Sequence, residues 1–175
     1  MGLYFVANGP APTTAAQVAV TTGTAIKTLL QISTSATKAA RVIEWGFKCD
    51  APASACLAVI ELIETGAVPA TSLTAHVTAG IIKYGSEAYS GGDPVTNLIP
   101  VGTAATGYNS GSSAEGTITA TRLLDQITTT IPSTNGYEFV KQLPLGREPT
   151  IPISTFLRVR VHFSVAVNAV CYVDI

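Results

Sequence analysis

The sequence is poor in charged residues. Asp, Glu, Lys and Arg make up 12% of its 175 residues, against roughly 25% in an average soluble domain. The formal net charge is -1, so the chain has no basic field that would attract nucleic acid or an anionic membrane. Its 47% of hydrophobic residues excludes an intrinsically disordered chain. The length fits one domain with a substantial core.

Long hydrophobic runs and processing signals are also missing. No uninterrupted apolar stretch approaches the roughly 18 residues of a membrane helix. The first residues lack the basic segment of a secretory signal, and Val6 stands where a myristoylation motif needs Ser or Thr. We therefore expect a soluble chain that is synthesised in the cytoplasm and has no membrane partner.

Residues of the common catalytic and metal-binding motifs are scarce. Cys49, Cys56 and Cys171 lack C-x-x-C spacing, so we expect buried thiols rather than disulfides or a zinc site. His76 and His162 stand at no metal-ligand spacing and are interpreted as structural. Nucleophile-elbow and phosphate-loop motifs do not occur. The sequence therefore predicts no enzyme, no cofactor and no metal site.

The polar residues that are present favour β-structure, because Thr, Ser, Gly and Pro all disfavour helix interiors. Alternating apolar and polar positions predict roughly eight to ten strands. The candidate segments for these strands are 3–7, 24–32, 41–48, 57–64, 73–77, 81–84, 116–122, 123–130, 137–142, 156–163 and 165–173. A short helix over 56–65 is the competing interpretation. This pattern predicts an all-β chain forming a single β-sandwich of jelly-roll type with long loops.

The division of the chain is predicted near residue 40. Residues 1–40 are interpreted as an extended N-terminal arm with the first strands, and residues 41–175 as the β-sandwich domain. Leu3, Tyr4, Phe5 and Val6 are apolar residues at an extreme terminus, and such residues are costly to leave in water. We expect these four side chains to contact a neighbouring subunit or a protein shell to which the chain attaches.

Tyrosines in the loop-rich middle of the sequence are further contact candidates. Residues 107–113 are rich in Gly and Ser and predict an exposed, flexible loop tip carrying Tyr108. Tyr84, Tyr89 and Tyr108 together would form a platform on which a sugar could stack. Subunit contacts by the same tyrosines are the simpler interpretation.

The best strand pattern is 41–48, and its expected partner is 57–64 across the loop 50–55. In this segment Ile43, Trp45 and Phe47 alternate with residues that face away from the core. A hairpin that places Cys49 opposite Cys56 would pair Trp45 with Ile60, Phe47 with Ala58 and Ile43 with Leu62.

The same hairpin would bring two carboxylates together. It pairs Glu44 with Glu61, and opposed carboxylates either raise one pKa, as in a catalytic acid, or recruit a cation. Arg158 and Arg160 lie two residues apart on one strand face and would supply that cation. We interpret the four residues as a structural ion network. A hydrolase that uses Glu44 and Glu61 is an open alternative.

A second ion pair follows from the same register. Arg41 would lie opposite Glu64, with Arg41 near the start of one strand and Glu64 at the end of the other.

Several short stretches resemble small structural proteins of tailed bacteriophages, most closely their β-rich head-decoration (cement) proteins. The stretches are Ala40–Phe47, Ala58–Leu62, Leu143–Pro149, Leu157–Val161 and Ala166–Val170. The resemblance covers residues 40–175. It implies a virion protein of the capsid surface, synthesised in the host cytoplasm, that binds the major capsid protein and stabilises capsomer contacts.

The resemblance also implies a homo-oligomer, most simply a trimer. The low charge fits a surface that is covered by identical neighbours, because interface cores are depleted in charge. A receptor-binding or glycan-binding β-sandwich of a phage tail or fibre is the alternative.

Overall fold

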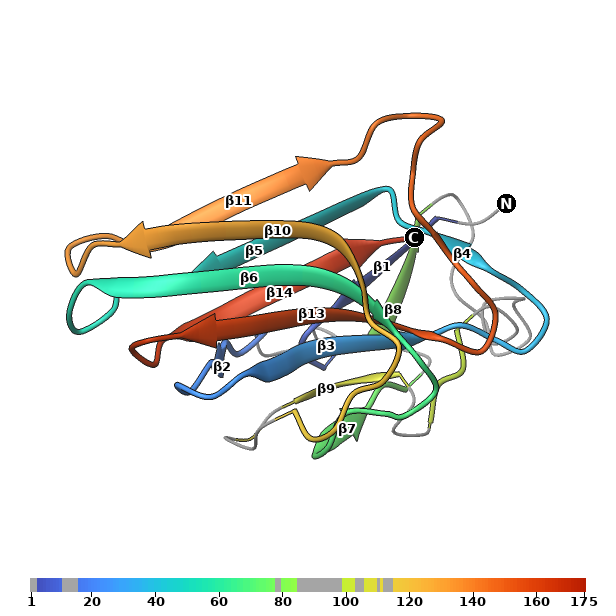
Figure 1. The fold of residues 1–175 in the computed structure, drawn as a ribbon, viewed down its shortest axis with the longest axis horizontal. Helices are drawn as coiled ribbons and strands as arrows, with labels where there is room; N and C mark the ends of the chain where they lie inside the picture. The colour runs from blue at the N-terminus through green and yellow to red at the C-terminus, as the bar shows by residue number, and fades with distance from the viewer. Residues whose placement is uncertain are drawn as a thin grey trace.

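The computed structural model describes residues 3–10, 16–77, 80–84, 99–102, 106–109, 111 and 115–175. Within these ranges the chain forms β-strands and no α-helix (Figure 1). The strands are β1 (Leu3–Ala7), β2 (Val20–Thr21), β3 (Lys27–Ser33), β4 (Ala40–Arg41), β5 (Glu44–Cys49), β6 (Cys56–Thr65), β7 (Leu73–Ala75), β8 (Ile81–Tyr84), β9 (Gly107–Asn109), β10 (Arg122–Ile131), β11 (Tyr137–Gln142), β12 (Thr150–Ile151), β13 (Phe156–Phe163) and β14 (Asn168–Asp174). A helix with the length and hydropathy for crossing a membrane does not occur among these residues.

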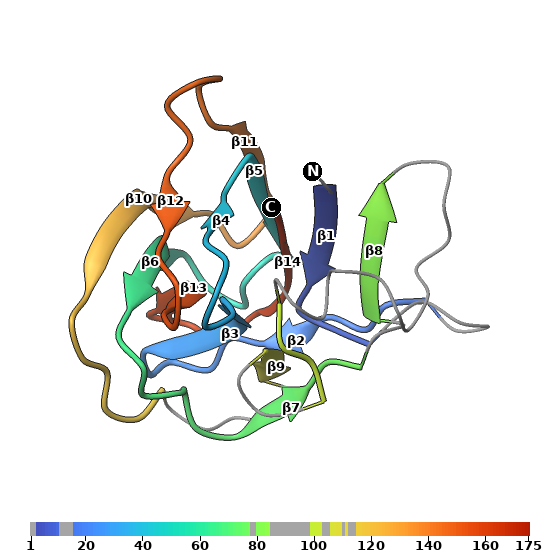
Figure 2. The same cartoon turned by 90° about the vertical axis from the view of Figure 1, so that its right-hand side faces the viewer.

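Two antiparallel sheets form the layers of a β-sandwich (Figure 2). Sheet A has the order β11-β5-β14-β1-β8, and β2 also pairs with β14. Sheet B has the order β10-β6-β13-β3-β9-β7, while β12 and β4 form a separate pair. The long strands β1, β3, β5 and β6 alternate between the sheets, and so do β10, β11, β13 and β14. The chain therefore crosses to the other layer each time it passes from one of these strands to the next, except from β6 to β10.

The core lies between the two sheets and follows the period of two that strands impose. Side chains of both sheets belong to one buried cluster, in which Trp45 and Phe47 come from β5 and Val159, Val161 and Phe163 come from β13. All three cysteines are buried free thiols, as the sequence predicts. Burial of this apolar surface, at roughly 25 cal/mol per Å², is the main force that holds the layers together.

The predicted hairpin between 41–48 and 57–64 is wrong. β5 pairs with β11 and β14, whereas β6 pairs with β10 and β13, so the loop between β5 and β6 joins the two sheets. Trp45 and Ile60 are nevertheless buried as predicted. Two strands that face each other across a sandwich show the same apolar alternation as two strands of one hairpin, so the pattern does not distinguish them.

Two predicted strands differ from the structure, and the choice between strand and helix over 56–65 is decided. The segment 41–48 is divided between β4 and β5, and as a result Val42 is buried in the core while Ile43 is half-buried. The segment 116–122 is not a strand, and β10 begins at Arg122. The segment 56–65 is a strand, which excludes the competing helix.

The apolar N-terminal segment is not a free arm, contrary to the prediction. β1 lies inside sheet A and pairs with β14 on one side and β8 on the other. Tyr4 and Val6 are buried in the core, and Leu3 and Phe5 are half-buried on the opposite face. Tyr4 and Val6 are therefore shielded from water by the core of their own chain, whereas Leu3 and Phe5 keep part of their surface exposed.

Trp45→Ala is expected to lower the free energy of unfolding by about 3–5 kcal/mol, as large-to-small core substitutions do. The Trp45 side chain is fully buried, and its Nε1 donates a hydrogen bond to Asp125 Oδ2 at 2.9 Å. Chemical denaturation measures the loss. Lys48→Ala, at an exposed position of the same strand, should change the stability by about 0.5 kcal/mol or less. An equally small loss for Trp45→Ala would contradict this core.

Candidate functional site

The two sheets carry separate polar clusters on their outer faces. Glu44 lies on β5 in sheet A, and Glu61 lies on β6 in sheet B. The predicted pairing of these two carboxylates is therefore wrong, and the hydrolase alternative loses the carboxylate pair on which it was based. The physical reason is the loop after β5, which carries the chain across to the other sheet instead of back along the same one.

The arginines of β13 form the predicted ion network only in part. Arg160 Nε contacts Glu61 Oε2 at 2.7 Å, as expected. Arg158 and Arg160 each contact Glu115 instead of Glu44, with Arg158 Nη1 and Arg160 Nη1 both 3.4 Å from its carboxylate oxygens. Thr28 of β3 also donates its hydroxyl hydrogen bond to Glu115. The carboxylate that completes the network therefore comes from a loop and not from β5.

This network attaches loop residues, among them Val68, Ala70 and Glu115, to the outer face of sheet B, and we call these residues the loop layer. Glu115 and Arg158 are both buried, and Arg158 Nη2 also donates to the carbonyl oxygen of Val68. The Ala70 amide donates to Gln31 of β3 at 2.9 Å. Burial lowers the pKa of the Arg158 guanidinium, while the neighbouring Glu115 carboxylate partly offsets this effect. Segments that follow β6 and precede β10 thus cover part of this face.

Sequence reasoning missed Glu115 because it belongs to no strand and follows a long Gly- and Ser-rich stretch. The available signal was indirect, since two arginines on one strand face need carboxylates when that face is covered. The predicted pair of Arg41 and Glu64 is also wrong. Glu64 pairs with Arg122 of β10, and Arg41 lies opposite Thr150 in the short pair of β4 and β12.

Tyr108 does not lie on an exposed loop tip, contrary to the prediction. It lies half-buried in β9, and its ring centroid is 5.0 Å from that of His76. His76 Nε2 lies 2.9 Å from the carbonyl oxygen of Ala7, and burial lowers the pKa of its imidazole. His76 therefore has a structural role in this part of the fold. Tyr89, the third tyrosine of the predicted sugar platform, falls outside the described residues.

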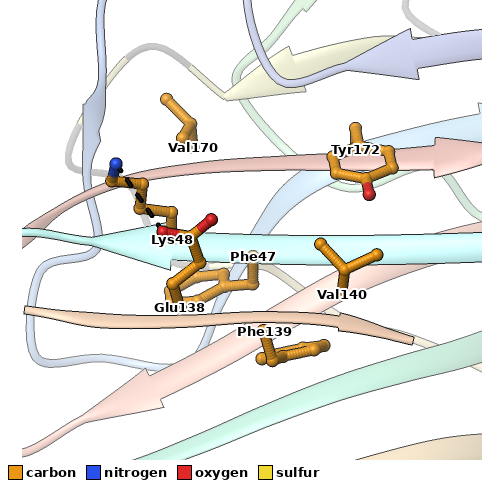
Figure 3. Close-up of a pocket in the computed structure, with 7 residues that line it drawn as sticks. All are labelled: Phe47, Lys48, Glu138, Phe139, Val140, Val170 and Tyr172. Carbon is orange, nitrogen blue, oxygen red and sulfur yellow. Dashed lines mark ion pairs between the residues drawn. The ribbon is translucent and has the colours of Figure 1, made fainter.

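The outer face of sheet A carries exposed apolar and aromatic side chains. Val140 of β11 is 57% exposed, Tyr84 of β8 is 46% exposed and Ile82 of the same strand is 43% exposed. A shallow hollow on this face is lined by Phe47, Lys48, Glu138, Phe139, Val140, Val170 and Tyr172 (Figure 3). An exposed ion pair between Lys48 and Glu138 borders the hollow.

Tyr172 lines this hollow and also contacts one of two neighbouring carboxylates. Its ring lies against Gly46, where an added Cβ would come within 2.4 Å of the ring, and it stacks on Phe5 with ring centroids 5.0 Å apart. Its hydroxyl donates to Glu44 Oε1 at 2.7 Å. Asp174, directly opposite Glu44 in the strand register, is the second carboxylate. The face thus combines apolar, aromatic and acidic groups, which suits binding of a partner or ligand.

Glu115→Gln is expected to lower the free energy of unfolding by about 3–5 kcal/mol, because it leaves the buried Arg158 guanidinium without its carboxylate. Urea denaturation checks this value. Glu138→Gln breaks an exposed pair instead, and we expect a loss of about 1 kcal/mol or less. Equal, small losses for the two variants would show that Glu115 does not anchor the loop layer.

Comparisons of the chain with protein-family models, with curated proteins and with solved structures found no match. Function is therefore inferred from the strand order and from the surfaces described above.

Proposed function

We propose that this chain is a β-sandwich of jelly-roll type that serves as a capsid decoration (cement) protein of a tailed bacteriophage. It binds the major capsid protein on the outer surface of the head and stabilises the contacts between capsomers. The contact surface is the outer face of sheet A, and the protein acts as a homo-oligomer, most simply a trimer. The proposal assigns no enzymatic activity.

The order of the eight long strands supports the jelly-roll assignment. Four of these strands lie in sheet A in the order β11-β5-β14-β1, and the other four lie in sheet B in the order β10-β6-β13-β3. Lettered B to I along the chain, they read G-D-I-B and F-E-H-C, which is the arrangement that defines a jelly roll. Viral capsid domains are among the proteins built on this fold, so the topology agrees with the resemblance to virion proteins.

The exposed apolar and aromatic side chains of sheet A are the observation that carries the proposal. Val140, Ile82 and Tyr84 are exposed on the outer face of sheet A. Loop segments anchored by Glu115 cover part of the outer face of sheet B, where Leu57 and Leu123 stay exposed. Partly exposed apolar and aromatic side chains on a flat surface are typical of a protein–protein contact. If such a contact is repeated on a capsid lattice, linked copies bind with a higher overall avidity than one weak contact provides.

A receptor-binding or glycan-binding role is the second candidate. Tyr172 and Tyr84 lie beside carboxylates on the outer face of sheet A, and aromatic rings with nearby hydrogen-bond acceptors also suit sugars. The two candidates differ in the partner that occupies the face. Binding of intact heads supports the first, whereas binding of host glycans without heads supports the second.

Purified protein is expected to bind undecorated heads of the phage that encodes it in a fixed copy number per head. Val140→Asp should weaken this binding at least tenfold, because it places an unpaired charge in the contact. Co-sedimentation with heads gives both values. Ile153→Asp is the matched control, since Ile153 is an exposed aliphatic residue in the connection between β12 and β13. Absence of head binding by the unmodified protein, or unchanged binding by Val140→Asp, would contradict the proposal.

The edge of sheet B supports self-association. β10 is an end strand whose only neighbour among the described strands is β6. The stretch from Gln126 to Ile131 carries no charge and reads Gln-Ile-Thr-Thr-Thr-Ile. A β-branched edge without a charged residue invites pairing with another chain. The charged residues of β10, Arg122 and Asp125, lie before this stretch, whereas β11, the corresponding edge of sheet A, carries Glu138 and Lys141 within its six residues.

Thr128→Lys is expected to convert the oligomer to monomers, because a lysine at this edge disfavours strand addition. Thr128 is exposed on β10, so the fold should tolerate the change. Sedimentation velocity at micromolar concentration measures the mass. Thr150→Lys, at an exposed position of β12, is the control and should leave the oligomer intact. An unmodified protein that sediments as a monomer would refute the edge contact.

A further inference from the structure

Glu44 and Asp174 form a pair of neighbouring carboxylates on sheet A. The two residues are directly opposite each other in the antiparallel register of β5 and β14. Opposed residues in such a pair have Cβ atoms about 4.5–5.5 Å apart. Their chain neighbours Trp45 and Val173 are buried in the core, so the alternation of side chains places both carboxylates on the outer face.

The hydrogen bonds of the two carboxylates come from tyrosines. Tyr172 donates to Glu44 Oε1 at 2.7 Å, and Tyr84 hydrogen-bonds to Asp174. Asp174 is only 9% exposed, and its Oδ1 is buried without a hydrogen-bond partner among the described residues. A buried carboxylate oxygen without a partner is costly, and a donor or a cation removes that cost.

The charge of the pair is not balanced by the ion pairs that the structure shows. None of these ion pairs, among the described residues, involves Glu44 or Asp174. Lys48, further along β5, pairs with Glu138. Burial and the neighbouring Glu44 raise the pKa of Asp174 to about 6.

We propose that Glu44 and Asp174 bind a Ca²⁺ ion on the outer face of sheet A. Carboxylate and other oxygen ligands with few geometric demands suit Ca²⁺ better than Mg²⁺, which requires near-ideal octahedral geometry. Gln142, opposite Glu44 on β11, offers an amide oxygen beside the pair, and water completes the coordination. A site with two protein carboxylates belongs to the weak class, with a dissociation constant of about 10⁻⁴–10⁻³ M. The site is a property of the folded chain and does not depend on the proposed function.

The competing occupant is a proton that the two carboxylates share. A shared proton satisfies Asp174 Oδ1 without any metal and becomes more populated as the pH falls through about 6. Ca²⁺ binding has the opposite dependence, because its ligands must be deprotonated. The two occupants are therefore distinguishable by the pH at which calcium has its effect.

Terbium luminescence and thermal unfolding test the site on the complete chain. Tb³⁺ is a luminescent probe for Ca²⁺ sites, and Tyr84 and Tyr172 lie close enough to the carboxylates to sensitise it. We expect tyrosine-excited Tb³⁺ emission at pH 7.5 that Ca²⁺ displaces. We also expect 10 mM Ca²⁺ to raise the melting temperature by about 3–6 °C, for a dissociation constant near 1 mM.

Substitutions separate the site from non-specific binding. Asp174→Asn and Glu44→Gln should each abolish the sensitised emission and the calcium-dependent rise in melting temperature. Both keep hydrogen-bonding groups for the tyrosines, and Asp174→Asn removes the like-charge repulsion, so folding should be retained. Glu138→Gln removes an exposed carboxylate on the neighbouring strand β11 and should leave both signals unchanged.

The response to pH completes the test. The effect of calcium should weaken as the pH falls from 7.5 to 5, because protonation of Asp174 competes with the ion. No calcium-dependent change at pH 7.5, or an equal change in Asp174→Asn and in the unmodified protein, would overturn the proposal. Stabilisation on acidification without any response to calcium would assign the pair to the shared proton instead.

Discussion

The contact of the Glu115 carboxylate with Arg158 and Arg160 holds loop segments over part of the outer face of sheet B. Arg158 is fully buried, and a buried guanidinium is tolerated only with a nearby carboxylate and further hydrogen-bond acceptors. Glu115, Thr28 and the Val68 carbonyl form this environment and hold the loop segments against sheet B. Val140, Ile82 and Tyr84 stay exposed on the outer face of sheet A.

The crossing of the chain between layers builds the outer face of sheet A from residues that are distant in the sequence. β14 lies between β1 and β5, so the C-terminal strand contacts the N-terminal strand as well as a strand near residue 45. Gly46 makes room for the ring of Tyr172, because any larger residue there would collide with it. The resulting position lets the Tyr172 hydroxyl reach Glu44. One glycine thus connects the strand order to the chemistry of the surface.

The sequence predicts the burial pattern of the fold better than its strand pairing. Alternation located β6, β11 and β13 almost to the residue, since one buried face is a local property of a strand. Pairing is not local, and the apolar pattern of β5 suits a hairpin and a crossing loop equally. Leu3 to Val6 were assigned to a partner because their true neighbour, β14, lies at the other end of the sequence.

The candidate sites show the same division. Glu61 and Arg160 were predicted to meet and do so, because they lie on strands whose outer faces could be read from the sequence. Asp174 and Glu115 were missed. Sequence spacing did not indicate the proposed Ca²⁺ site, because Glu44 and Asp174 meet only through the pairing of β5 with β14. The general expectation that opposed carboxylates raise one pKa holds at Asp174, whose pKa is raised by burial and by its neighbour Glu44.

The central claim is that the outer face of sheet A contacts the capsid. Hydroxyl-radical footprinting of the protein, free and bound to heads, tests it residue by residue. Tyr84 and Tyr172 lie on the outer face of sheet A, whereas the exposed His162 lies on β13 of sheet B. We predict that head binding reduces oxidation of both tyrosines and leaves the oxidation of His162 unchanged. Protection of His162 with unchanged tyrosines would contradict this account.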